Sequence, residues 1–204
     1  MIIYLIRHGV TELNKKRCLQ GRSDIELNDY GRELARKTAE GIKDVKLDMI
    51  FTSPLKRAAE TAEIIKGDRN IPIIPEERII EISFGDYEGL SFGEETYNIP
   101  DPDFMNFFKA PEMYNIPPKG ESFQEVIKRT GEFLKELSQN EDYQDKTILL
   151  STHGCALKAL LANIKGTPLP EFWGEGVHKN CAVSMVEYTD GEYYLLEEGK
   201  VYYS

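Results

Sequence analysis

Two histidine–glycine pairs, each placed directly after a short apolar run, are the residues of this chain best suited to chemistry. One pair begins at His8, after the apolar run 2–6, and the other begins at His153, after the run 147–151. A neutral imidazole can attack phosphorus through nitrogen, because its unperturbed pKa is about 6.5. Arg7 precedes the first pair, and a guanidinium stays charged and forks onto two oxygens of an anion. The combination is typical of a site that transfers a phosphoryl group.

A second arginine follows a third apolar run. Arg57 comes shortly after residues 47–52. Taken singly, a histidine after a strand is usually a turn or core residue, and a helical arginine is usually a solvated charge. Two histidines and two arginines at one edge of a sheet favour a phosphate site instead. Gly9 and Gly154 would let the backbone approach the anion closely.

A zinc site is the other common use of histidines. No acidic or cysteine ligand recurs at metal-binding spacing. The three cysteines, Cys18, Cys155 and Cys181, are far apart and form no CxxC pair. Their odd number also argues against a disulfide framework. We therefore expect neither a metal nor another cofactor.

Apolar runs typical of buried strands alternate with stretches typical of amphipathic helices. The expected strands are residues 2–6, 47–52, 71–74 and 147–151, the expected helices are 28–44, 53–66, 121–137 and 155–164, and an expected hairpin joins 181–188 to 192–196. The order predicts an α/β fold: a three-layer sandwich with a mostly parallel sheet flanked by helices and an antiparallel element near the C-terminus. Such sheets bind ligands beyond the carboxyl ends of their strands. We expect residues 1–204 to form a single domain.

Residues 91–119 differ in composition from the rest of the chain. Prolines, which break long elements, alternate there with aromatic side chains, which favour burial. They include Pro100, Pro102, Pro111, Pro117, Pro118, Tyr97, Phe104, Phe107, Phe108 and Tyr114. We interpret this segment as an insertion that caps the site.

The chain has 204 residues and a formal charge of -10, from 35 acidic and 25 basic side chains. Such a surface repels nucleic-acid backbones and anionic membranes, although it permits a small basic pocket. The apolar run at the N-terminus lacks a basic leader and is too short to span a membrane. We expect a small phosphate ester as the partner, no nucleic acid, no membrane and a cytoplasmic location. The oligomeric state stays open.

The motifs around these residues resemble the signature of the histidine phosphatase superfamily, the phosphoglycerate-mutase-like clan. The resemblance begins with LIRHG at 5–9 and TELN at 11–14, and it continues with QGRSD at 20–24, TSPLKRA at 52–58, GDYEG at 85–89, GES at 120–122 and STHG at 151–154. It spans nearly the whole chain, and residues 91–119 are its least constrained part.

The resemblance implies metal-independent hydrolysis of phosphate monoesters through a phosphohistidine. It assigns the phosphorylated nucleophile to His8, the rest of the phosphate pocket to Arg7, Arg57 and His153, a phosphoryl contact to Asn14, substrate contacts to Gln20 and Gly21, and the proton donor to Glu81. A general acid helps because an alkoxide leaves poorly, and the same carboxylate can then activate water. The residues alone do not separate Glu81 from the carboxylates around it.

A mutase would need extra cations to hold a second phosphate. Here Ile82, Ser83 and Phe84 follow Glu81 instead, and residues 91–119 are rich in acidic side chains. This pattern favours a phosphatase of broad specificity, or one that prefers a leaving group of low charge. The alternatives are a dedicated α-ribazole phosphatase or sugar (bis)phosphatase, a phosphoglycerate mutase, a non-catalytic phospho-ligand binding protein and a metallohydrolase.

Overall fold

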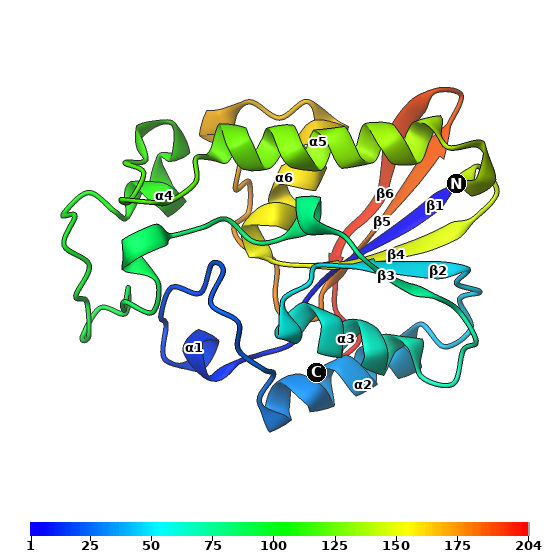
Figure 1. Ribbon diagram of the computed structural model, residues 1–204, viewed down its shortest axis with the longest axis horizontal. Helices are drawn as coiled ribbons and strands as arrows, with labels where there is room; N and C mark the ends of the chain where they lie inside the picture. Colours follow the sequence, from blue (N-terminus) through cyan, green and yellow to red (C-terminus); the bar gives the residue numbers. More distant parts are fainter. Residues whose placement is uncertain (204) are drawn as a thin grey trace.

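A six-stranded mixed sheet lies at the centre of the computed structural model, which describes residues 1–203 (Figure 1). The strands are β1 (Ile2–Arg7), β2 (Met49–Thr52), β3 (Ile73–Pro75), β4 (Thr147–Thr152), β5 (Val183–Thr189) and β6 (Glu192–Lys200). Their order is β3-β2-β4-β1-β5-β6. The first four strands in this order run parallel, while β5 is antiparallel to β1 and β6 to β5. The predicted α/β fold with its antiparallel hairpin is confirmed.

Helices cover both faces of this sheet (Figure 1). On one face lie α2 (Asp29–Gly41) and α3 (Lys56–Lys66), and on the other α5 (Phe123–Gln139) and α6 (Gly154–Lys165). The central strands are apolar on both sides, as a covered parallel sheet requires. In β4, Ile148 and Leu150 pack with α5 and α6, while Leu149 packs in the cluster that contains Ala62 and Ile65 of α3. None of the helices within residues 1–203 is long and apolar enough to cross a membrane.

The ends of several elements differ from the prediction for local reasons. Helix α3 begins at Lys56 rather than at residue 53, because the Ser53 N–H still donates to Ser151 O and so continues the sheet. The third strand is shifted and includes Pro75. This proline is tolerated because β3 lies at the edge of the sheet, where its missing N–H faces no partner strand.

The pairing register brings the carboxyl ends of three strands level with one another. Arg7 pairs with Thr152 of β4, and Thr52 of β2 pairs with Ser151. The residues that follow these ends therefore lie side by side at one edge of the sheet, and they are His8, Ser53 and His153. Two short helices that the sequence did not predict, α1 (Glu12–Lys15) and α4 (Asn106–Lys109), lie in loops.

The segment 91–119, with α4, lies at the opposite end of the molecule from the N-terminus (Figure 1). Its aromatic rings pack in a cluster with Phe123 of α5 and with Trp173. Phe107 is the centre of this cluster, with ring centroids 5.0 Å from Phe123 and 5.2 Å from Trp173. The Trp173 indole N–H also donates to the Phe107 carbonyl. These contacts fix the segment against two distant parts of the chain.

Candidate active site

A cavity of about 340 Å³ opens beyond the carboxyl ends of β1 and β4. Six of the residues predicted for the site line it: Arg7, His8, Asn14, Gln20, Glu81 and Gly154. Its apolar wall includes Phe84, Phe92, Phe107, Phe108, Trp173 and Val177. Three of these six come from segment 91–119. The remaining predicted residues, Arg57, His153 and Gly21, lie directly behind this lining, as the contacts below show.

The His8 ring is held in one tautomer. Its Nδ1 lies 2.7 Å from the Gly9 carbonyl oxygen, which can only accept, so Nδ1 carries the proton. The opposite nitrogen, Nε2, accepts a hydrogen bond of 3.3 Å from the Arg57 Nε–H. The lone pair of His8 therefore lies on Nε2, which makes this the nitrogen that could act as a nucleophile.

Burial and two cations keep His8 neutral. The ring is 2% exposed. Burial lowers the pKa of His8 well below its ordinary 6.5, and the positive charges of Arg57 and Arg7 lower it further. The imidazole is thus unprotonated at neutral pH, as a nucleophile must be.

Arg57 is fully buried on α3 and binds the loop in front of it. Its two terminal nitrogens donate to the carbonyls of Ser23 (2.7 Å), Gln20 (3.0 Å) and Gly21 (2.7 Å). Burial lowers the pKa of Arg57 to about 10, which leaves the guanidinium charged at neutral pH. Arg57 therefore binds the loop and at the same time places a positive charge against His8 Nε2.

Three polar atoms in the site are buried and have no hydrogen-bond partner among the described residues: Arg7 Nε, Gln20 Nε2 and His153 Nδ1. Such atoms are costly unless a ligand satisfies them. Asn14 also lines the pocket, and its amide oxygen is turned back onto the Thr11 N–H at 3.1 Å, so its amide nitrogen is the group available to a ligand. Unpartnered polar groups of this kind are what an oxyanion ligand would satisfy.

Glu81 is a loop residue, 8% exposed, whose carboxylate lies against the first turn of α6. Its carboxylate accepts the backbone N–H groups of Cys155 (3.1 Å) and Ala156 (3.0 Å). It also faces the lining glycine, because a Cβ built on Gly154 would lie 3.6 Å from Glu81 Oε2 and 3.7 Å from Arg7 Nε. A carboxylate and a guanidinium therefore both lie beside the backbone at the start of this helix.

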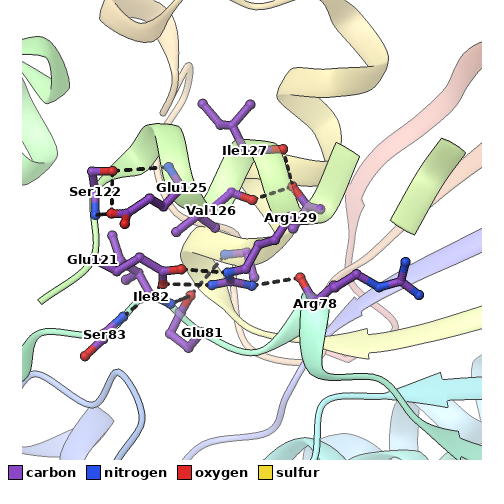
Figure 2. A network of polar contacts seen from close by, with 12 residues as sticks. Arg78, Glu81, Ile82, Ser83, Glu121, Ser122, Glu125, Val126, Ile127 and Arg129 are labelled. Carbon is purple, nitrogen blue, oxygen red and sulfur yellow. Dashed lines mark hydrogen bonds and ion pairs between the residues drawn. The ribbon is translucent and has the colours of Figure 1, made fainter. Parts of the chain in front are cut away.

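A polar network outside the pocket holds the segment that carries Glu81 (Figure 2). Arg129 of α5 donates to the Arg78 carbonyl at 2.7 Å and to both carboxylate oxygens of Glu121. Glu121 in turn accepts the Ser83 N–H at 3.3 Å. The chain is thus tied to α5 on both sides of Glu81, which explains how a loop residue keeps a defined position.

Comparison with known proteins identifies the family of this chain. A family model described as histidine phosphatase superfamily (branch 1) matches residues 3–199. The chain belongs to the histidine phosphatase superfamily. A Bacillus subtilis (strain 168) relative named uncharacterized phosphatase PhoE is 36% identical over 92% of this chain and 89% of its own. A Hydrogenobacter thermophilus relative named putative phosphoserine phosphatase 2 is 33% identical over 93% of this chain and 90% of its own.

A solved structure of related sequence has the same fold as this chain. Bacillus stearothermophilus YhfR shares 37% sequence identity with this chain and has a TM-score of 0.90, covering 98% of this chain and 97% of that one. The family model and the relatives named as phosphatases identify the chain as a phosphatase, a phosphoric monoester hydrolase.

In this histidine phosphatase, Gly21 supports the pocket from behind Gln20. Its N–H donates to Glu88 at 2.9 Å, and its carbonyl accepts from Arg57. A Cβ at this position would lie 2.2 Å from the Ile82 carbonyl oxygen. The backbones approach too closely here for any side chain, so glycine is required.

Two residues of the site were not singled out from the sequence. Asn180 lines the pocket, and its amide N–H donates to the carbonyls of His8 (2.9 Å) and Gly9 (3.3 Å). Ser53 bonds to the second histidine of the site, as described below. The predicted strand 181–188 offered a signal for Asn180, because the start of an antiparallel neighbour meets the carboxyl end of the first strand.

The histidine phosphatase site contains no candidate metal centre in the described part of the chain. No group of three or more His, Cys, Asp or Glu side chains within residues 1–203 is arranged to hold a metal ion. The cysteines at positions 18, 155 and 181 are free thiols.

Stability should fall as pH falls below about 6.5, because His8 and His153 stay neutral in the folded protein. Burial and Arg57 lower the pKa of both rings, so the unfolded chain binds more protons in this range. Unfolding then becomes easier by up to about 1.4 kcal/mol per pH unit for each histidine. Urea unfolding at pH 7.5, 6.5 and 5.5 measures this slope. The free energy of unfolding of the His8→Asn variant should depend less steeply on pH. Equal slopes for the two proteins would contradict the neutral state assigned to His8.

Proposed function

We propose that this protein hydrolyses phosphate monoesters through a phosphohistidine intermediate on His8, with Glu81 as the general acid and base. One observation carries the proposal. A neutral His8, whose lone pair lies on Nε2, is close to three buried polar atoms that have no partner among the described residues, on Arg7, Gln20 and His153. A phosphoryl group placed there would meet the nucleophile and satisfy these donors together.

In the first step, His8 Nε2 attacks phosphorus and the bond to the ester oxygen breaks. Glu81, in its protonated form, gives its proton to the leaving oxygen, which departs as an alcohol. Arg7 and His153 donate to the non-bridging oxygens, whose charge the guanidinium also balances. The arrangement supplies positioning and charge, which are the main needs of phosphoryl transfer.

In the second step, water attacks phosphorus and the N–P bond breaks. The Glu81 carboxylate accepts the water proton, so phosphate leaves while His8 returns to its neutral form. Glu81 thereby recovers the proton that it gave to the alcohol. Its position at the first turn of α6, beside Arg7, lets one carboxyl group serve both steps.

The leaving group would lie against the aromatic wall of the pocket. Phe92, Phe107 and Phe108 contribute to this wall from segment 91–119, and Trp173 and Phe84 complete it. Aromatic walls of this kind bind apolar or aromatic groups without demanding one shape. We therefore assign the protein a broad specificity for esters with an apolar leaving group, with segment 91–119 as the lid of the site.

Substrate profiling tests this assignment. With chelator present, we expect kcat/KM for aryl phosphates to exceed kcat/KM for 3-phosphoglycerate mutation by at least about 100-fold, because the wall offers mainly rings, with the guanidinium of Arg17 beside Phe92. The panel includes α-ribazole 5′-phosphate, phosphoserine and sugar bisphosphates, since a dedicated enzyme would hydrolyse one of these far better than the rest.

Other outcomes would replace the proposal. A dominant mutase activity would contradict it. Hydrolysis that stops in chelator and returns with zinc would indicate a metallohydrolase. Tight binding of esters without turnover would indicate a binding protein.

A further inference from the structure

The Ser53 hydroxyl contacts the second histidine of the site. Ser53 Oγ lies 2.7 Å from His153 Nε2, and both residues are 0% exposed. The serine follows β2 directly, and its N–H donates to the Ser151 carbonyl at 2.9 Å, so its backbone is fixed by the sheet. A buried hydroxyl this close to an imidazole nitrogen must either donate to it or accept from it.

The surrounding groups decide the direction of this hydrogen bond. The other neighbour of Ser53 Oγ is the Leu55 N–H, at 3.4 Å, which is a donor. If His153 Nε2 also donated, the serine proton would be buried with no acceptor recorded among the described residues. If the serine donates to Nε2, its proton has an acceptor and the Leu55 N–H has one as well. The second arrangement satisfies all three groups.

The proton of the His153 ring must then lie on the other nitrogen. Burial and the nearby Arg57 keep the pKa of His153 well below 6.5, so the neutral ring carries a single proton. With Nε2 accepting from the serine, this proton is on Nδ1. His153 Nδ1 is a buried atom with no hydrogen-bond partner within residues 1–203, and the ring centroid lies 5.1 Å from that of His8.

We infer that Ser53 is a positioning residue that holds His153 in the tautomer with its proton on Nδ1, so that this ring donates to the transferring phosphoryl group. The inference rests on the proposed function. The role of Ser53 also explains how two neighbouring histidines present different groups to the phosphoryl group. A carbonyl acceptor at Gly9 makes His8 present a lone pair, while a hydroxyl donor at Ser53 makes His153 present an N–H.

Nitrogen NMR of the whole protein tests the tautomer without any need for turnover. In protein labelled with ¹⁵N-histidine at pH 7.5, we expect His153 Nδ1 to show the shift of a protonated nitrogen and Nε2 that of an unprotonated one. His8 should show the same pattern, fixed by Gly9, and Ser53→Ala should change only the His153 signals. A wild-type His153 with its proton on Nε2 would overturn the inference, even if the protein is an active phosphatase.

Kinetics provide the second readout. In Ser53→Ala, kcat for an aryl phosphate should fall by about 100-fold, the usual effect of losing one oxyanion donor, while KM changes little. Ser53→Thr keeps the hydroxyl and should recover most of kcat. Ser184→Ala removes another buried serine hydroxyl, on β5 outside the pocket, and should leave kcat unchanged. An unchanged kcat in a natively folded Ser53→Ala protein would overturn the inference.

Discussion

Replacing His8 with alanine should abolish hydrolysis, lowering kcat by about 10⁵-fold or more, as removal of a nucleophile does in other covalent mechanisms. The physical reason is specific to one atom. Nε2 of this ring carries the lone pair, because Nδ1 is tied to the Gly9 carbonyl. The neighbouring ring of His153 cannot substitute, because the proposed tautomer presents an N–H there. Arg7 and Arg57 remain in the variant, so ester binding should persist while turnover stops.

Trapping the intermediate makes this test sharper. The proteins react with an ester that carries a label on its phosphoryl group and are then quenched rapidly in alkali, in which phosphohistidine survives. Wild-type protein should carry the label, and His8→Ala protein should not. Glu81→Gln serves as the matched variant. With a leaving group that needs no acid, such as 4-nitrophenolate, it should accumulate phosphoenzyme, because the base for the second step is missing. Label that persists in His8→Ala would place the nucleophile elsewhere.

Arg57→Lys should cost both activity and stability, and it should do so although the charge is kept. We expect kcat/KM to fall by about 10³-fold and the free energy of unfolding to fall by about 3 kcal/mol. Arg57 donates to the carbonyls of Ser23, Gln20 and Gly21 as well as to His8. An ammonium cannot reach these acceptors in one plane, so buried carbonyls would lose their donors.

Steady-state kinetics and urea unfolding of Arg57→Lys and Arg57→Ala measure the two effects. Arg36→Ala is the control, since this exposed arginine lies on α2 with its side chain in solvent, and its unfolding free energy should change by less than about 0.5 kcal/mol. Wild-type kinetics in Arg57→Lys would show that a point charge is sufficient and would refute the role assigned to the guanidinium fork.

The strands, and the meeting of the main candidate residues at one edge of the sheet, were predictable because both follow local rules. Apolar runs show the central strands, and His8, Arg57 and His153 come at or soon after the ends of these runs. The topology of a parallel sheet then brings such ends together without any knowledge of side-chain contacts. The N-cap of α2 is also local, and the Asn28 side chain does accept from the Gly31 N–H.

What the sequence did not show depends on contacts between distant segments. Glu88 is one of several carboxylates in its region, yet it alone accepts the N–H groups of Gly21, Arg22, Ser23 and Phe84. The sequence pattern does not indicate this role, because three of the four donors, in residues 21–23, lie 65 to 67 residues away from Glu88 along the chain. The aromatic residues of segment 91–119 likewise predicted burial, but their neighbours on α5 and at residue 173 became known only from the structure.

The central position of β1 has a consequence for synthesis of the protein. Ile2 pairs with Thr147 on one side and with Glu187 on the other. β1 is therefore synthesised well before either of the strands with which it pairs. At the usual translation rate, the roughly 140 residues between β1 and β4 take about 7–28 s to produce. Until then the segment Ile2–Arg7 has two open edges, and open apolar edges aggregate. A truncated chain that ends before Thr147 should therefore show little phosphatase activity and should bind chaperones, even if its helices form.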